Sequence, residues 1–144
     1  MSIKSIADRA ITAEALCKSL QKEFPFLKWT WDGRFEAHLA EVAIEDAQKV
    51  SEFLRAQFAA HFDKKSLKTA PEEIRAAVES SGGLESGQNY YTSEDTGDAF
   101  LYGAWWPWGN GKVISLRVGV KINLEKIAEQ LPPFQDFPKW ISHS

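Results

Sequence analysis

Few side chains in this sequence stand at the spacings that a known catalytic or phosphate-binding motif requires. Asn110-Gly111-Lys112 matches only the end of the phosphate-binding loop G-x-x-x-x-G-K-S/T. Trp106 stands where the first glycine is needed, and Val113 replaces the hydroxyl residue. The sequence also contains no H-E-x-x-H, G-x-S-x-G or G-x-G-x-x-G pattern. The sequence therefore predicts no catalytic class from a motif.

Metal-ligand spacings are equally sparse. One cysteine and three scattered histidines give no zinc pattern. The run Asp95-Thr96-Gly97-Asp98 lacks the residue order of a calcium loop and its distal glutamate. Cys17 falls on the apolar stripe of a predicted helix, where a buried, unreactive thiol is the expected state. We expect no metal ion and no cofactor.

One pair of side chains has the types needed for acid–base chemistry. Glu36 and His38 alternate along a predicted strand and would share one of its faces. Together with Tyr90 they would supply the polar groups of a cleft between the sheet and the second predicted helix. This spacing is generic on exposed strands, so it supports only the alternative hypothesis of a small enzyme or ligand-binding domain.

The aromatic residues form a more specific pattern around a predicted hairpin. Asn110-Gly111 between two β-like runs is the preferred pair for a two-residue type I′ turn. That turn would place Tyr102 opposite Gly119, Ala104 opposite Arg117 and Trp106 opposite Ser115. Tyr102 and Trp106, with Phe100, then lie on a face whose second strand is polar.

Two interpretations of this aromatic face remain open. A helix or the aromatic C-terminal segment could cover it, with Gly119 making room for Tyr102. Alternatively, the face is a binding platform on which Tyr102, Trp106 and Arg117 contact a partner, since such residues dominate the binding energy of interfaces.

The charge distribution favours a partner. No Lys or Arg occurs in residues 76–111, which hold five acidic residues: Glu79, Glu85, Glu94, Asp95 and Asp98. The local charge is therefore −5, and the rest of the chain carries +2 of the total −3. An acidic loop beside aromatic side chains suits a basic protein, because opposite charge steers association. The other explanation is a solvated loop kept soluble by its acids.

The hydrophobic periods predict the elements that must position these residues. Helical spacing is expected from a Thr12 N-cap to Phe24, from Glu45 to Phe62 and after the capping box at Thr69–Glu72, ending at Gly82-Gly83. Period-two alternation predicts strands over 27–39, joined by the three-residue loop Asp32-Gly33-Arg34, and on both sides of Asn110-Gly111.

A short strand is expected at Asn89–Thr92, a final helix from Asn123 to Leu131, and a C-terminal segment that packs back through Phe137, Trp140 and Ile141. The predicted fold is one α+β domain spanning 1–144, with a mostly antiparallel sheet of about four to five strands packed by three to four helices.

Composition excludes several classes of protein. At 144 residues, 44% of them hydrophobic, the chain is too apolar to be disordered and fits a single domain. The most apolar run, 100–108, is broken by Gly103 and Pro107 and is too short for a membrane span. The net acidity argues against nucleic acid as a partner. The lone cysteine and the absence of a signal sequence favour the cytoplasm.

These patterns lead to one expected function. We expect a small protein-binding module, most concretely an inhibitor or immunity-type protein, as in a bacterial toxin–antitoxin pair, that neutralises a basic protein. Three residues would supply charge and three would supply contact: Glu94, Asp95, Asp98, and Tyr102, Trp106, Arg117. The sequence leaves open the identity of the partner, the source and the oligomeric state.

Overall fold

The computed structural model describes residues 6–93, 99–122 and 136–143. In chain order the elements are α1 (Ile6–Glu23), β1 (Trp29–Asp32), β2 (Ala37–Ala43), α2 (Ile44–Gln57), β3 (Ala60–Asp63), the 3₁₀ turn η1 (Ser66–Thr69), α3 (Glu72–Ser80), β4 (Asn89–Thr92), β5 (Ala99–Pro107), β6 (Val113–Ile122) and the 3₁₀ turn η4 (Phe137–Lys139). The helix predicted from Asn123 lies outside the described residues. None of the described helices is long and apolar enough to cross a membrane.

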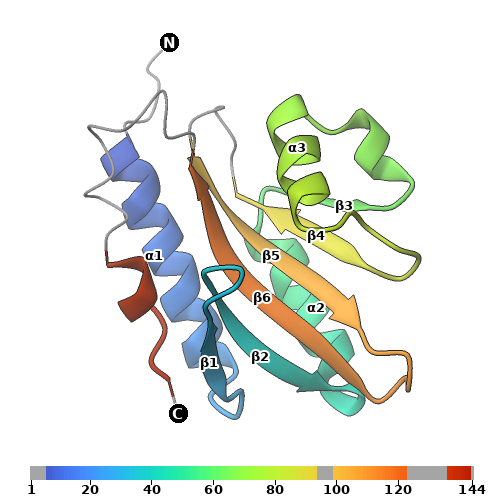
Figure 1. Cartoon of the computed structure of the whole chain (residues 1–144). Helices are drawn as coiled ribbons and strands as arrows, with labels where there is room; N and C mark the ends of the chain where they lie inside the picture. The colour runs from blue at the N-terminus through green and yellow to red at the C-terminus, as the bar shows by residue number, and fades with distance from the viewer. Residues whose placement is uncertain (1–5, 94–98, 123–135, 144) are drawn as a thin grey trace.

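The strands form a single antiparallel sheet in the order β1-β2-β6-β5-β4-β3 (Figure 1). The α+β class and the antiparallel sheet are confirmed, but the sheet has six strands rather than four to five. The additional strand is β3, a segment whose hydrophobic spacing predicts a continuation of the second helix. Phe58 and Phe62 have helical spacing, yet α2 ends at Gln57, and Phe62 instead pairs with Tyr90 of β4. Pairing with a distant strand therefore outweighed the local period.

The β5–β6 hairpin has the predicted register. Tyr102 lies opposite Gly119, and Trp106 lies opposite Ser115. The loop is nevertheless longer than two residues, because the Trp108 N–H donates to the Val113 carbonyl and closes a loop over 109–112. Within it the Asn110 side chain accepts from the Lys112 N–H at 2.9 Å, as asparagine often does in turns.

The β1–β2 hairpin does not have the predicted register. Trp31 lies opposite His38 and Asp32 opposite Ala37, so the loop has four residues, 33–36, instead of the three residues Asp32-Gly33-Arg34. Glu36 closes this loop with a φ of 51°, in the left-handed region. The alternation of apolar residues carries no signal for a left-handed backbone conformation at a glutamate, so it does not predict this loop.

Helices cover the two faces of the sheet unequally. α1, α2 and the C-terminal segment pack on one face around Leu20, Trp29, Leu54 and Leu116. On the other face α3 covers Tyr90, Phe100 and Tyr102 near β4 and β5. Figure 1 shows α3 over that side of the sheet, with none of the described helices in front of β2 and β6.

Tyr102 occupies space that exists because residue 119 is a glycine. A β-carbon at Gly119 would lie 2.5 Å from Cε2 and Cζ of Tyr102. The Tyr102 ring stacks on Tyr90 with centroids 5.1 Å apart and has little room to move. Of the two interpretations of the aromatic face, the covered one therefore describes the environment of Phe100 and Tyr102.

Replacing Gly119 by alanine is expected to lower the free energy of unfolding by about 1–3 kcal/mol, the usual cost of overpacking. Gly103→Ala is the matched control in the same hairpin, because its β-carbon would lie at an ordinary 3.6 Å from the Phe58 ring. We expect the control to change stability by less than about 1 kcal/mol. Urea denaturation of both variants measures the difference, and equal losses would contradict this packing.

Candidate functional site

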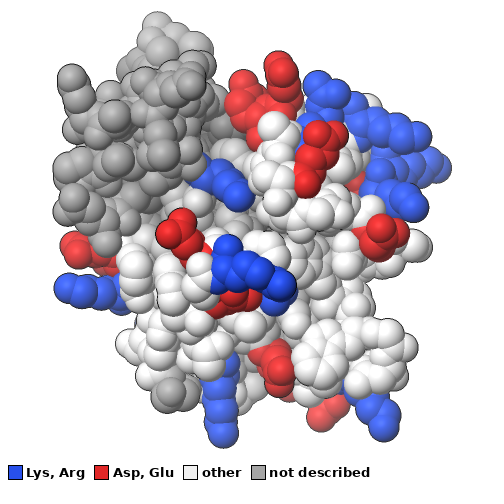
Figure 2. Space-filling view, viewed as in Figure 1, with Lys and Arg blue, Asp and Glu red and all other residues white. Residues whose placement is uncertain are grey.

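The open part of the sheet presents one face of β1, β2 and β6. On this face Thr30 lies opposite Leu39, which in turn lies opposite Arg117, and Glu41 lies opposite Ser115. Thr30 and Glu41 are exposed, and the other three are partly exposed. Figure 2 shows positive and negative groups interspersed over this side of the molecule. A sheet face that no helix of the described ranges covers is available to a partner.

Arg117 is the centre of a cluster on this face. Its Nε donates to Oδ2 of Asp32 at 2.9 Å, and its side chain is only 13% exposed. The guanidinium lies 4.8 Å from the centroid of the Trp106 ring and 4.9 Å from that of Phe35. These two rings meet edge to face at 5.8 Å. We call Asp32, Phe35, Trp106 and Arg117 the arginine cluster. Cation–π contact and the ion pair hold the guanidinium in one position.

Asp32 joins the arginine cluster to the β1–β2 loop. Its Oδ1 accepts from the Arg34 N–H at 3.0 Å and from the Phe35 N–H at 3.4 Å, while Oδ2 accepts from Arg117. Burial opposes ionisation of this carboxyl, but these donors outweigh burial and lower the pKa of Asp32 below its usual 3.8. One carboxylate thus fixes both the loop and the arginine.

Two more side chains extend the surface. The Arg34 guanidinium lies 4.6 Å from the centroid of the Phe35 ring, on an exposed part of the loop. Trp108 is 43% exposed and donates from Nε1 to the Ser115 hydroxyl at 2.8 Å. Since Ser115 belongs to the open face, Trp108 lies over the same side of the sheet as Arg117.

The structure brings together two of the three predicted contact residues. Trp106 and Arg117 touch, whereas Tyr102 is only 3% exposed beneath α3. Burial raises the pKa of Tyr102 to about 12, so its phenol stays protonated. The three predicted charged residues, Glu94, Asp95 and Asp98, lie outside the described part of the chain.

Sequence reasoning missed Asp32, Arg34, Phe35 and Trp108. The Asp32-Gly33 pair did signal a turn, but the register expected for it gave Asp32 no role beyond the turn. Only the antiparallel pairing of β2 with β6, which places Leu39 opposite Arg117, brings the β1–β2 loop beside Arg117.

The acid–base pair expected from Glu36 and His38 does not form. Glu36 is exposed in the β1–β2 loop, whereas His38 is buried on the opposite face of the sheet. Burial lowers the pKa of His38. Tyr90, the third polar group of that hypothesis, is buried beneath α3 in the cluster that holds Tyr102. The three side chains therefore occupy three separate environments.

A cleft does lie between the β1–β2 loop and the end of α3. It has a volume of about 700 Å³ and is lined by Gly33, Arg34, Phe35, Glu36, Ser80, Ser81 and Lys121. Arg34 and Lys121 have no ion-pair partner among the residues that the structure describes. The cleft adjoins the arginine cluster, with which it shares Phe35.

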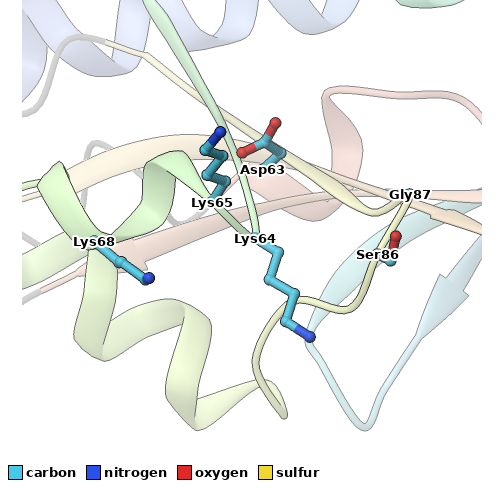
Figure 3. A pocket seen from close by; sticks show the side chains of 6 residues that line it. All are labelled: Asp63, Lys64, Lys65, Lys68, Ser86 and Gly87. Carbon is cyan, nitrogen blue, oxygen red and sulfur yellow. The ribbon is translucent and has the colours of Figure 1, made fainter.

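A second hollow carries a concentration of lysines. Figure 2 shows Lys and Arg gathered at the corner formed by η1, and Figure 3 shows the hollow of about 410 Å³ between η1 and the loop after α3. Lys64 and Lys68 extend away from Asp63, whereas Lys65 extends toward it. The ammonium groups therefore do not converge on one point, as a preorganised anion site would require.

Cys17 is fully buried, as its place on the apolar stripe predicted. Burial raises the pKa of the thiol to about 12, which leaves almost no thiolate at neutral pH. Within the described ranges, no three His, Cys, Asp or Glu side chains gather as metal ligands would.

Comparison with known proteins yields no relative: no family model, curated protein or solved structure matches this chain.

The Asp32–Arg117 pair is expected to contribute a coupling free energy of about 1.5–3 kcal/mol at pH 7, the range of a hydrogen bond to a charged group. A double-mutant cycle with Asp32→Asn and Arg117→Met measures it. The exposed Asp46–Lys49 pair, at 3.1 Å, is the control and should give less than about 0.5 kcal/mol.

The same cycle should depend on pH. A carboxyl whose folded-state pKa is lowered stabilises the fold above its unfolded value of about 3.8, and this contribution is lost as pH falls toward the folded-state pKa. We therefore expect a smaller coupling at pH 3 than at pH 7. Equal couplings at both pH values would show that the ion pair is not its source.

Proposed function

We propose that this chain is a protein-binding module whose contact surface is the open face of β1, β2 and β6, centred on the arginine cluster. The observation that carries the proposal is the uneven covering of the sheet. α3 covers one part of this face, and beside it an arginine is held between two aromatic rings on a surface that none of the described helices covers.

The chemistry of this surface suits a protein partner. Trp, Tyr and Arg are the residues most enriched at the energetic centres of protein interfaces. Here Arg117 is already ordered by Asp32, so binding costs little of its side-chain entropy. The indole Nε1 of Trp106 is buried with no hydrogen-bond partner among the described residues. A small rearrangement on binding would allow a partner to accept this hydrogen bond.

The partner that we propose is basic, and the module acts on it as an inhibitor of the immunity type. Residues 76–111 carry a charge of −5. Ser93 and Ala99, which flank residues 94–98, lie near the end of the sheet that carries the β1–β2 loop. Ala99 pairs with Ile122, and the neighbouring Lys121 lines the cleft beside that loop. The acidic groups of residues 76–111 would attract a basic protein to the domain.

Trp108→Ala and Glu41→Gln are expected to weaken association at least tenfold while the fold is retained, because Trp108 offers an exposed aromatic contact and Glu41 is an exposed acidic group on the open face that attracts a basic partner. The matched control is Ile11→Ala, an apolar residue on α1 that is 67% exposed and lies outside this face. Tagged wild type and variants are used for capture from the organism's own lysate, and the affinity of each captured protein is then measured by calorimetry.

A basic protein that binds wild type and Ile11→Ala equally, and binds the two surface variants at least tenfold more weakly, would support this function. Equal affinity for all four proteins would refute the assignment of the open face. An acidic captured protein would refute the charge argument but leave the surface in place.

The cleft beside the β1–β2 loop favours a second candidate function, the binding of a small anionic molecule. Arg34 and Lys121 line it, and Phe35 offers an aromatic ring to a planar group. Lys121→Met should then abolish ligand shifts in the NMR spectrum of the purified protein screened against carboxylates and phosphates. Lys112→Met, in the exposed β5–β6 loop, is the control. Shifts that survive Lys121→Met would exclude this cleft.

A further inference from the structure

The C-terminal segment 136–143 returns to the body of the domain and packs beside α1 and β1 (Figure 1). Phe137, Trp140 and Ile141 are buried in the same core cluster as α1, which confirms the expected packing of this segment. Gln21 of α1 makes two hydrogen bonds with Ser142 near the end of this segment. Its Nε2 donates to the Ser142 carbonyl at 3.0 Å, and the Ser142 N–H donates to its Oε1 at 3.2 Å.

His38 makes further polar contacts with the segment. Its ring is fully buried, with Nε2 2.8 Å from the Phe137 carbonyl oxygen and Nδ1 2.8 Å from Nε2 of His143. A carbonyl only accepts hydrogen bonds, so His38 Nε2 carries the hydrogen. In the neutral ring Nδ1 is then an acceptor, and His143 must donate from Nε2. The contacts therefore assign one tautomer to each ring.

These tautomers respond differently to a first and a second proton. His143 is exposed and can take a proton on Nδ1 while its Nε2 continues to donate to His38. This hydrogen bond then becomes charge-assisted and stronger. A second proton has to occupy His38 Nδ1, where it would face the N–H of a charged His143. That state has two donors, two positive charges and no acceptor between the rings.

Within the ranges 6–93, 99–122 and 136–143, no other charged group acts on His38 to relieve this conflict. The rings packed against it are Trp31 at 5.1 Å and Phe137 at 4.8 Å, and its strand neighbour on β6 is Val118. Among the described residues His143 is the one titratable group that acts on His38. Separating the two rings relieves this double protonation.

We propose that His38 and His143 form an acid-operated latch, which holds the segment 136–143 on the domain at neutral pH and releases it when both imidazoles are protonated. Release exposes the apolar side chains of Phe137, Trp140 and Ile141 together with the surface of α1 and β1 that they cover. The latch lies on the face opposite the arginine cluster and does not depend on the proposed function.

The direction of the pH effect follows from burial. Burial lowers the pKa of His38 in the folded state relative to the usual 6.5. The stabilising contribution of neutral His38 is then present above 6.5 and is lost as pH falls from there toward the folded-state pKa. Opening therefore occurs on the acidic side of pH 6.5.

Hydrogen exchange tests the latch in the full chain, with EDTA present to exclude a metal ion between the two rings. The Lys139, Trp140 and Ser142 amides, all hydrogen-bonded in the closed segment, report its opening. After correction for intrinsic rates, we expect their protection in the wild type to fall at least tenfold from pH 7.5 to pH 5. The amides of β5 and β6 should keep their protection, which distinguishes opening of the segment 136–143 from global unfolding.

Two variants distinguish the latch from general acid sensitivity. His143→Gln keeps a donor for His38 and, after its amide turns, can offer an acceptor, so the protection of its segment should change less than threefold over the same pH range. His61→Gln removes the third histidine, which stacks on Tyr91 away from the segment, and should behave like the wild type. Unchanged protection in the wild type, or an equal fall in His143→Gln, would overturn the proposal.

Discussion

The antiparallel pairing of β5 with β6 is the constraint on which the rest of the structure depends. It runs from Ala99 opposite Ile122 to Pro107 opposite Ile114 at the centre of the sheet. Because side chains alternate along both strands, this register sends the aliphatic residues of β6 toward α1 and α2. It sends Phe100, Tyr102 and Trp106 to the other face, beside Arg117 and Gly119. A slip of one residue would exchange these two sets.

The aromatic face is then divided by the limited reach of α3. With nine residues, α3 is long enough to cover Tyr90, Phe100 and Tyr102 but not the strands beyond β5. The same row of aromatic residues consequently has two environments. Tyr102 is buried core, held flat against Gly119, while Trp106 sits at the border of the covered region and packs on Arg117. The candidate surface begins where the helix ends.

Polar side chains connect parts of the chain that are distant in sequence. Asp32 links the β1–β2 loop to β6, and His38 links β2 to the C-terminal segment. Each is shielded from water, and each has specific hydrogen-bond partners, as a buried polar group requires. The two lie on opposite faces of the sheet, so the surface and the latch are independent.

The sequence by itself determined those features that depend on residues close together in the chain. The α+β class, the existence of the three described helices and the β5–β6 register follow from hydrophobic period and from the position of Asn110-Gly111 between the two strands. The predicted helix caps are wrong: α1 begins at Ile6, before Thr12, and α3 begins at Glu72 without a side-chain cap, while Thr69 belongs to η1. The burial of Cys17 and of the C-terminal aromatic residues follows from the same patterns. Each of these features depends on interactions within one helix, within one hairpin, or between the apolar stripe of one segment and the core. The local spacing of residues was therefore sufficient to predict it.

The tertiary structure decided what depended on distant partners. β3 forms because Phe62 pairs with Tyr90 of β4, although Phe62 has helical spacing to Phe58. The register of the β1–β2 hairpin differs from the predicted one because its loop has four residues and ends at Glu36 in a left-handed conformation. In this loop the Asp32 carboxylate accepts hydrogen bonds from Arg34, Phe35 and Arg117. The length of α3 determines which aromatic residues are buried. No local pattern encodes these outcomes, because each is a competition between packing partners that meet only after the chain has folded.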